Sequence, residues 1–530
     1  MRLSGRQFFL FFLSLLTPFV VLSQGKITGD IEIYQNFYLL DTVVLGPEAT
    51  VPPQYKRQLS STEGWLTVNY TDKDFSAGVR FDLFNNSGLR NPRAAFSGQG
   101  LGFWFVRKKI EKLDVTLGYF YDQIGSGIIF RAYEGRGQNL DYAMQGIRLK
   151  YDISDQWRVK AFTGKQKFQF GTYSDIIKGI NLEGAMNLGK DLNIQPGFGI
   201  VNRTLDDNSL NTVVNNINNL PVADRFVPMA NTWAYSAYAA VNYKRFTMNL
   251  EYAGKTREAG YDATSRLVNR DGQVMYGSLS YSQPGFGASI QYKSTDFFDF
   301  RVNPNEALNN GLINFIPPSV KMNTWRLTSR YAPATQLVGE RGLMADVVMT
   351  VAKKHTIQIN YSDVKRPNGE RLYQEFNIEG KFKLSKSFTA TAGLQRQIYN
   401  QTVYEGVANS MVHTWTPFTE FVYKINRKKS LRMEFSHMST QQDLGSWLWG
   451  LVEYNVAPKF SLSVMDMWNY GNKNADRRVH YWTVFGAVNF GRSRLTGGYV
   501  RQVQGVICTG GVCRVEPAFN GFRFTLVSTF

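Results

Sequence analysis

One pattern of side chains recurs along most of this chain of 530 residues: apolar and polar residues alternate over segments of about 10 to 14 residues. Between Phe75 and Phe84, for example, apolar side chains alternate with polar residues or Gly. A period of two predicts a β-strand with one apolar face and one polar face. Tight polar turns, as at Lys353-Lys354, alternate with longer connections, which is the pattern of antiparallel hairpins. The chain is therefore predicted to be all-β.

We count about 24 such segments, within a range of about 22 to 26, and the last one runs from Phe519 to Phe530. The apolar residues on one face of its last nine residues are Phe522, Phe524, Leu526 and Phe530. Ser528 is the polar exception on that face. A strand that ends the chain needs a pairing partner, which a closed barrel supplies. We predict a single large antiparallel transmembrane β-barrel, closed by pairing this strand with the segment Lys26 to Leu40.

An even strand count places both chain ends on the periplasmic side and every second connection outside the cell. The longest connections fall in that outer class, at about 41–61, 123–140, 204–230 and 298–340. Within the last of these, Arg301 to Val320 carries three Pro residues and an apolar run. It is predicted either to narrow a pore or bind a partner, or simply to pack on neighbouring loops. An array of secreted β-sandwiches is the alternative fold, but it would have connections of similar length at both ends.

The first 23 residues have the features of a cleaved secretory signal peptide. Arg2 and Arg6 precede an apolar run from Phe8 to Leu22. A membrane-anchoring helix is the alternative, but Pro18 and the shortness of the run argue against it. The predicted domains are residues 1–23 as signal peptide and 24–530 as barrel. Removing the two Arg residues lowers the net charge from +18 to +16, and export argues against a nucleic-acid partner.

Composition fits a membrane barrel without proving one. Aromatic residues make up 14% of the chain, Gly occurs 47 times, and no segment after the signal peptide approaches 18 consecutive apolar residues. The ten Trp residues fall mostly near the ends of predicted strands, where they would form girdles at the lipid headgroups. They could instead be core residues of a soluble β-protein. They are Trp65, Trp104, Trp157, Trp233, Trp325, Trp415, Trp447, Trp449, Trp468 and Trp482.

Charged residues on the polar faces of the strands are predicted to line the lumen. The predicted lumen charges are Arg80, Asp82, Arg148, Lys150, Arg158, Lys160, Glu251, Glu375, Glu379, Lys381, Lys383, Arg432 and Glu434. Cations outnumber anions among them, which would favour anionic solutes. Alternatively, opposite charges pair across neighbouring strands and only hold the wall. Asp466 shares a face with the apolar residues of its strand, so that strand is bulged, lies near the rim or is inverted.

Few residues suggest chemistry. The four His residues are scattered, no metal-ligand spacing occurs, and no phosphate loop or nucleophile-elbow motif is present. We therefore expect no enzyme activity, no metal and no cofactor. His437 with Ser436, Ser439 and Asp443 is the single hydrolase candidate, set against ordinary polar residues near a barrel rim.

Cys508 and Cys513 flank Thr-Gly-Gly-Val at the tip of the last predicted hairpin. In an exported protein, such a pair predicts a disulfide rather than a metal or redox site. Closing so small a loop would stabilise the fold by about 2 to 3 kcal/mol at most.

Two features carry a resemblance to known proteins. The terminal strand resembles the C-terminal signal of bacterial outer-membrane barrels, which the barrel-assembly machinery recognises. The segment Gly510-Gly511-Val512-Cys513-Arg514 followed by Pro517, with the aromatic block His413 to Phe418 leading to Trp447-Leu-Trp449, resembles a porin-like outer-membrane β-barrel family of Bacteroidota. This resemblance covers the whole mature chain. It implies location and fold, and no reaction.

The sequence thus favours a porin-like channel of the outer membrane whose loops obstruct the lumen. The alternatives are a non-conducting accessory barrel of an assembly or secretion complex, and a barrel-embedded hydrolase. The expected partners are outer-membrane lipid, the barrel-assembly machinery during biogenesis, and other envelope proteins.

Overall fold

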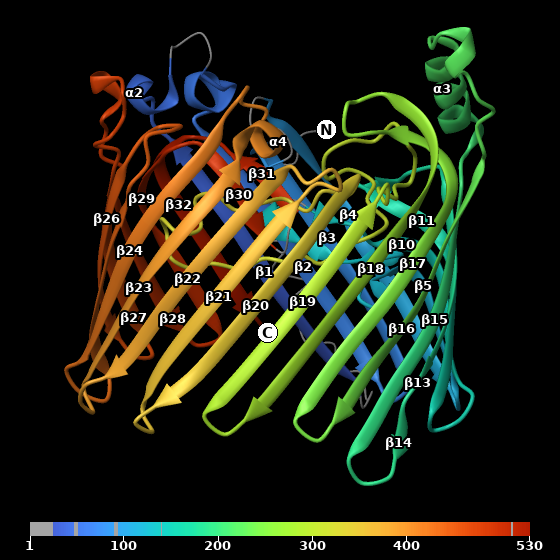
Figure 1. The fold of residues 1–530 in the computed structure, drawn as a ribbon, viewed down its shortest axis with the longest axis horizontal. Helices are drawn as coiled ribbons and strands as arrows, with labels where there is room; N and C mark the ends of the chain where they lie inside the picture. The colour runs from blue at the N-terminus through green and yellow to red at the C-terminus, as the bar shows by residue number, and fades with distance from the viewer. Residues whose placement is uncertain (1–24, 47–50, 90–93, 139, 510–511) are drawn as a thin grey trace, which may run out of the picture.

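The alternating segments form the wall of a closed barrel in the computed structural model (Figure 1). The structure describes residues 25–46, 51–89, 94–138, 140–509 and 512–530. The main sheet contains 26 strands, of which β12 and β14 extend the wall position of β13. The wall therefore has 24 antiparallel strand positions, and the predicted fold class and strand count are confirmed. The predicted signal peptide, residues 1–23, lies outside the described residues.

The wall follows the chain order. Its strands are β1 (Lys26–Tyr38), β2 (Ser60–Asp72), β3 (Phe75–Ser87), β4 (Phe96–Ile110), β5 (Leu113–Phe120), β10 (Met144–Asp152), β11 (Trp157–Phe168), β12 (Gly171–Thr172), β13 (Ile176–Gly184), β14 (Met186–Leu188), β15 (Leu192–Thr204), β16 (Asn231–Tyr243), β17 (Phe246–Tyr261), β18 (Leu267–Gln283), β19 (Phe286–Asp296), β20 (Gly339–Val351), β21 (His355–Lys365), β22 (Arg371–Lys383), β23 (Phe388–Asn400), β24 (Met411–Lys424), β25 (Lys429–Met438), β26 (Trp447–Val456), β27 (Phe460–Trp468), β28 (Thr483–Phe490), β29 (Ser493–Gln502) and β32 (Phe519–Thr529).

The terminal strand closes the barrel. β32 pairs with β29 on one side and with β1 on the other. The backbone of Phe530 exchanges hydrogen bonds of 3.0 and 3.1 Å with that of Gly29. Ser528, the polar exception on the outer face of β32, places its hydroxyl oxygen 2.7 Å from that of Ser493 on β29. A cross-strand hydrogen bond therefore accommodates this polar residue among apolar neighbours.

The two rims differ in the length of their connections. Eleven short turns form one rim, at 73–74, 111–112, 153–156, 189–191, 244–245, 284–285, 352–354, 384–387, 425–428, 457–459 and 491–492. The chain segments of the opposite rim are 39–59, 88–95, 121–143, 169–175, 205–230, 262–266, 297–338, 366–370, 401–410, 439–446, 469–482 and 503–518. The register of β1 with β2 and β32 places both ends of the barrel wall at the short-turn rim.

Short helices and hairpins occupy the long connections. They are α2 (Thr42–Leu45), η2 (Gln54–Gln58), α3 (Asp207–Asn218), η4 (Val222–Asp224), α4 (Gln401–Glu405), η5 (Ala475–Arg477) and the hairpin β30 (Gly505–Thr509) to β31 (Val512–Glu516). Figure 1 shows α2, α3 and α4 at the long-connection rim. α3 begins where the Asp206 carboxylate accepts a hydrogen bond from the backbone N–H of Ser209, at 3.0 Å. Among the described residues, no helix is long and apolar enough to cross a membrane.

The strands have two unlike faces, as the alternation predicts. On β3, Val79 and Phe81 are 49% and 45% exposed on the outside, whereas Arg80 and Asp82 are buried on the inside. Asp466 lies on the outer face of β27, where its carboxylate is 2.6 Å from His480 Nδ1. This contact accommodates the polar side chain on that face, so β27 need not be inverted.

The prediction that Trp residues form girdles is wrong for part of the set. Trp65, Trp447 and Trp449 are buried, and Trp325 belongs to a connection that reaches the inner wall. These side chains lie inside because aromatic rings also fill the space between the wall and chain segments in the lumen, which the position of a Trp near a strand end cannot reveal.

Candidate functional site

The lumen is lined by the thirteen charged residues that the sequence predicts, and most of them contact chain segments that fold inward. They lie on β3, β10, β11, β17, β22 and β25, at positions that alternate with outward apolar residues. Only some of these charged residues pair with opposite charges on the wall itself. Arg158 binds Asp152 at 2.6 Å, and Arg432 binds Glu434 at 2.8 Å and also Glu420. These three pairs join neighbouring strands or neighbouring positions of the wall.

Residues 121–143 form the first inward loop. It consists of the hairpin β6 (Asp122–Ile124) with β7 (Phe130–Ala132) and the hairpin β8 (Glu134–Gly135) with β9 (Leu140–Asp141), and η3 (Arg136–Gln138) lies between β8 and β9. Arg136 Nη1 lies 2.6 Å from Glu32 Oε2 on β1. The Ser126 hydroxyl and backbone N–H donate to the Glu251 carboxylate on β17, at 2.6 and 2.8 Å. A loop that starts at β5 therefore contacts both β1 and β17 across the interior.

Acidic residues of the first inward loop neutralise cations of the wall. Arg80 contacts Asp82 at 2.7 Å, Glu134 at 2.6 Å and Asp141 at 2.7 Å. Asp141 also contacts Lys167 Nζ at 2.5 Å. Burial by itself would raise the pKa of Asp141, but Lys167 and Arg80 lower it overall. This carboxylate thus stays ionised and holds the loop against β3 and β11.

Asp122 holds the other end of the same loop to β10 and β11. Its carboxylate lies 3.2 Å from Arg148, 3.3 Å from Lys150 and 3.4 Å from Lys160. Burial alone would raise the pKa of Asp122, but these three cations lower it overall. Three of the predicted lumen cations therefore share one anion supplied by the loop.

Residues 297–338 form the second inward loop, which packs on the first. The backbone N–H of Arg131 donates to the carbonyl of Ile313 at 2.8 Å, and that of Phe315 donates to the carbonyl of Gly127 at 2.9 Å. The Arg131 guanidinium also lies 4.0 Å from the centre of the Phe315 ring. The two inward loops thus form one layer inside the barrel.

The second inward loop continues to the opposite wall. Asn323 donates to Glu375 at 2.7 Å, and the Trp325 indole N–H donates to Glu379 at 2.9 Å. Glu375 also accepts a 2.9 Å hydrogen bond from Gln395 on β23. Two predicted lumen carboxylates therefore position this loop through hydrogen bonds rather than facing open water.

Apolar contacts fix both inward loops. One cluster combines Ile124, Ile128, Ile129, Phe130, Phe298, Phe300, Val302, Ile313 and Ile316 of the loops with Phe162, Ile177, Val201, Ala234, Ala253 and Val274 of the wall. A second cluster packs Val320, Leu327 and Tyr331 against Tyr373, Tyr399, Val412, Met438 and Trp447. At Gly199 on β15, a Cβ atom would lie 2.4 Å from Ile124 Cγ2, so only Gly allows this close approach. The inner wall is therefore apolar where the loops pack on it.

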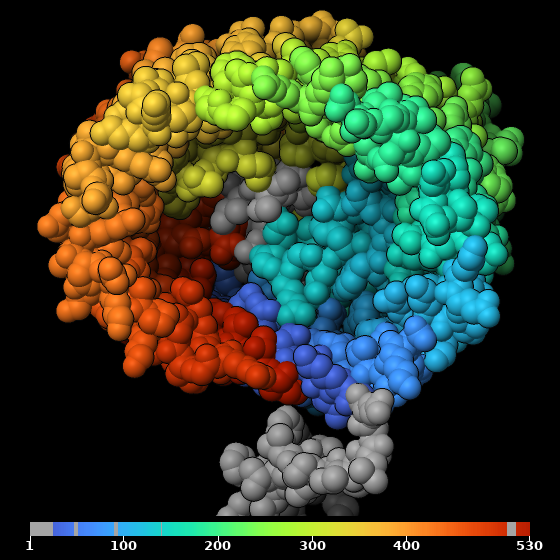
Figure 2. Space-filling view, turned by 90° about the horizontal axis from the view of Figure 1, so that it is seen from below, coloured from blue at the N-terminus to red at the C-terminus, as the bar shows by residue number. Residues whose placement is uncertain are grey.

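Cavities lie on both sides of the inward loops. Toward the long connections, a cavity of about 930 Å³ is lined by residues that include Arg80, Asp141 and Lys167. Toward the short turns, a cavity of about 560 Å³ is lined by residues that include Ser126 and Glu251. Seen from the short-turn rim, the barrel is hollow and chain segments lie inside the ring of strands (Figure 2).

A group of cations at the short-turn side includes residues that the sequence analysis missed. Arg107 and Lys109 on β4 line a pocket of about 230 Å³ with Arg148, Lys150 and Arg158. The other lining residues are Asp114 and Asp152, so cations exceed anions there by five to two. We call these five cations the cation stripe. The apolar residues Val106 and Ile110, at the alternate positions of β4, were the signal that could have placed Arg107 and Lys109 on the inner face.

The other residues that the sequence singled out are two lysines of β22 and the hydrolase candidates around His437. Lys381 and Lys383 are exposed at the end of β22. Ser436 is buried on the inner side, whereas Phe435, one position before it, is 47% exposed on the outside. His437 Nε2 lies 2.5 Å from the Tyr470 hydroxyl, and Asp443 accepts a 2.7 Å hydrogen bond from Tyr331 instead. The structure therefore does not assemble these residues into a Ser–His–Asp arrangement.

The remaining candidates are a metal site and the disulfide between Cys508 and Cys513. Among the described residues, no group of three or more His, Cys, Asp or Glu side chains could hold a metal ion. Cys508 lies opposite Cys513 in the register of β30 and β31. The two side chains lie outside what the structure describes, so the disulfide stays a prediction.

Solved structures with similar folds are large membrane barrels. The P pilus usher (PapC) translocation pore superposes with a TM-score of 0.44 at 9% identity, over 95% of this chain and 99% of the pore. The siderophore receptor PirA from Pseudomonas aeruginosa gives 0.41 at 7% identity, over 96% and 81%. Pseudomonas aeruginosa OccK8 (OprE) gives 0.39 at 11% identity, over 84% and 98%. These are similarities of fold alone.

Comparison of sequences gives one match. No curated protein matches the chain. A family model described as a family of unknown function, DUF6029, matches residues 6–530. The chain therefore belongs to the DUF6029 family.

Proposed function

We propose that this protein is an outer-membrane barrel that passes small anionic solutes through a lumen narrowed by its two inward loops. Its outer face supports the membrane location, since Leu250, Ile290 and Val464 are 50%, 47% and 50% exposed on the outside of different strands. Such an apolar surface is stable in lipid and unfavourable in water. In this orientation the short turns and both chain ends face the periplasm, and the long connections face outward.

The cation stripe is the observation that carries the proposed selectivity. It lies on β4, β10 and β11, at the short-turn side of the inward loops. Its five cations exceed the three anions that pair with them, Asp114, Asp122 and Asp152, which gives this part of the lumen a positive potential that favours anions over cations. The inward loops set the width of the passage, since their contacts span from β1 to β23.

Planar-bilayer recording of purified protein tests this function. We expect stable ohmic conductance, and a reversal potential in a KCl gradient that shows a preference for chloride. The variant Lys109→Gln with Lys150→Gln is expected to lower the anion-to-cation permeability ratio at least about twofold. The control Lys56→Gln with Lys473→Gln, at the opposite rim, is expected to leave the ratio unchanged. Conductance with no ion preference in the wild type would contradict the anionic solute class.

A non-conducting accessory barrel is the alternative function. The observation that favours it is the packing of both inward loops, which combines buried ion pairs with two apolar clusters. A lumen filled in this way suits a scaffold that binds other envelope proteins. Absence of conductance, together with envelope proteins that co-purify in mild detergent, would favour this alternative.

A further inference from the structure

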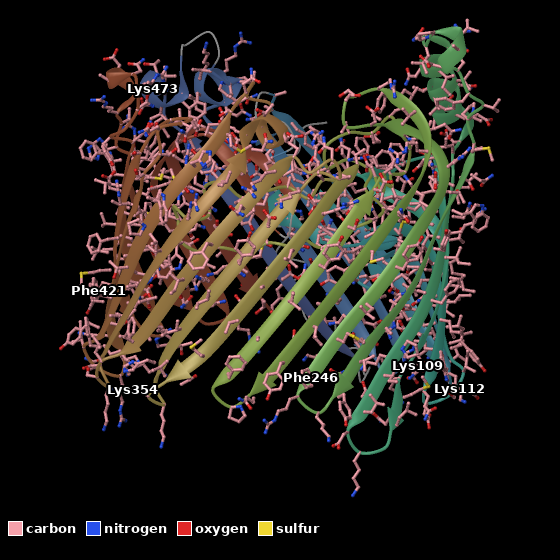
Figure 3. The ribbon with its side chains drawn as sticks, viewed as in Figure 1. Lys109, Lys112, Phe246, Lys354, Phe421 and Lys473 are labelled. Carbon is pink, nitrogen blue, oxygen red and sulfur yellow. The ribbon has the colours of Figure 1, made fainter. Side chains whose placement is uncertain are left out.

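The two rims of the barrel carry very different charge. The eleven short turns contain twelve Lys or Arg residues and four Asp or Glu residues. The ten long connections other than the two inward loops contain 11 Lys or Arg residues and 12 Asp or Glu residues. We call the twelve cations of the short turns the basic rim. Figure 3 shows Lys112 and Lys354 of the basic rim, with Lys473 at the opposite end.

The cations of the basic rim form no ion pairs with other described residues. All twelve residues are exposed, and within the described part of the chain none of them forms an ion pair. Several are adjacent in sequence, as are Lys244 with Arg245, Lys353 with Lys354, and Arg427 with Lys428. Adjacent like charges repel each other unless an external anion neutralises them. The rim is therefore suited to a partner that presents many negative charges in one plane.

Aromatic residues on the outer wall lie directly above the basic rim. Tyr243 and Phe246 flank the turn at 244–245 and are 47% and 46% exposed. Lys244 Nζ lies 5.2 Å from the centre of the Tyr243 ring. Figure 3 shows Phe246 and Phe421 on the wall above the rim. Aromatic rings followed by cations along the barrel axis match the order of acyl chain, interface and headgroup in a lipid leaflet.

We propose that the basic rim binds the anionic headgroups of a phospholipid leaflet, with phosphatidylglycerol-type lipids as its ligands. This inference rests on the membrane location in the proposed function, and it does not depend on conductance. The rim cations neutralise the lipid phosphates, and the aromatic residues above them anchor the wall at the interface. Because the phospholipid leaflet of an outer membrane faces the periplasm, the same contact orients the short turns inward.

Lipid binding to the folded protein in non-ionic detergent tests this proposal. Phosphatidylglycerol and phosphatidylcholine with matched acyl chains are added at equal concentration, and native mass spectrometry counts the lipids bound. The wild type is expected to retain more phosphatidylglycerol than phosphatidylcholine. The rim variant changes Lys353, Lys354, Arg427 and Lys428 to Gln. It should lose about fivefold in phosphatidylglycerol affinity for each cation that reaches a headgroup, with phosphatidylcholine binding unchanged.

A matched variant separates the rim from total charge. It changes Lys56, Arg57, Arg266 and Lys473, which are exposed at the opposite rim, to Gln, so its net charge equals that of the rim variant. Retained phosphatidylglycerol preference in this control supports the proposal. Equal loss in both variants, no lipid preference in the wild type, or an acidic protein that binds the rim more tightly than lipid would overturn it. Resistance to unfolding in detergent at room temperature shows that each variant is folded.

Discussion

Removing the charge of Asp141 should loosen the first inward loop without disturbing the barrel wall. In the variant Asp141→Asn, Arg80 and Lys167 lose an anion that lies 2.7 and 2.5 Å away. Breaking a buried ion pair from one side costs about 3 to 5 kcal/mol. Here we expect about 2 to 3 kcal/mol, because both cations keep Asp82 as a partner, at 2.7 and 3.5 Å.

That energy applies to detachment of the loop, since the wall strands keep their backbone ladder. A change of about 2 to 3 kcal/mol raises the population of the detached loop about 30- to 150-fold. Backbone hydrogen exchange across the first inward loop should accelerate by this factor. In planar bilayers, the variant should also spend more time at a higher conductance level.

Asp191→Asn is the control for this variant. Asp191 is exposed in the short turn at 189–191 and does not line either cavity beside the inward loops. Its exchange rates and conductance should equal those of the wild type. If exchange in the first inward loop of the Asp141→Asn variant also equals that of the wild type, the ion pairs of Asp141 do not hold the loop in place.

Four further predictions concern the first inward loop, the terminal strand and the cysteine pair. The depressed pKa of Asp122 means that its ion pairs stabilise the loop fully above the unfolded pKa of about 4 and less as the pH falls below it. Hydrogen exchange in the loop, corrected for intrinsic rates, should therefore be faster at pH 3 than at pH 6, and the difference should be smaller in the Asp122→Asn variant, in which the ion pairs of Asp141 keep their own pH dependence. Gly199→Leu should displace the loop and raise conductance, as measured in bilayers. Deletion of Phe530 should lower the amount of assembled protein in the outer membrane, and normal surface levels would contradict that role. Intact mass without reductant should be about two units lower than expected for free Cys508 and Cys513, whereas two free thiols would contradict the disulfide.

The sequence was sufficient to predict which face of each strand a residue occupies. Alternation is a local property, so the side taken by Arg80 or Glu375 follows from its neighbours on the same strand. The strand count also follows, because each hairpin turn has its own local signal. Closure by β32 needed one further assumption, that a terminal strand ending on Phe530 must be paired.

The partners of the inner residues could not be predicted in this way. Glu251 binds Ser126, which is 125 residues away along the chain, and nothing local to either residue encodes that contact. The direction in which a long connection folds depends on packing across the whole lumen. The adjacent apolar residues Ile128 and Ile129, in a connection expected to be exposed, were the available signal that it would be buried.

Small residues on the inner wall explain why the two loops can lie inside the barrel. Ala234 and Ala253 occupy inward positions on β16 and β17, and both are fully buried in the cluster that holds the loops. In a lumen filled with water these positions would be expected to be polar. Small apolar side chains instead leave room for Phe298 and the Ile residues of the loops, as Gly199 does for Ile124. Because this part of the wall is built as a protein interior, the proposed channel would have to pass beside the loops, where charged residues such as the cation stripe line the remaining space.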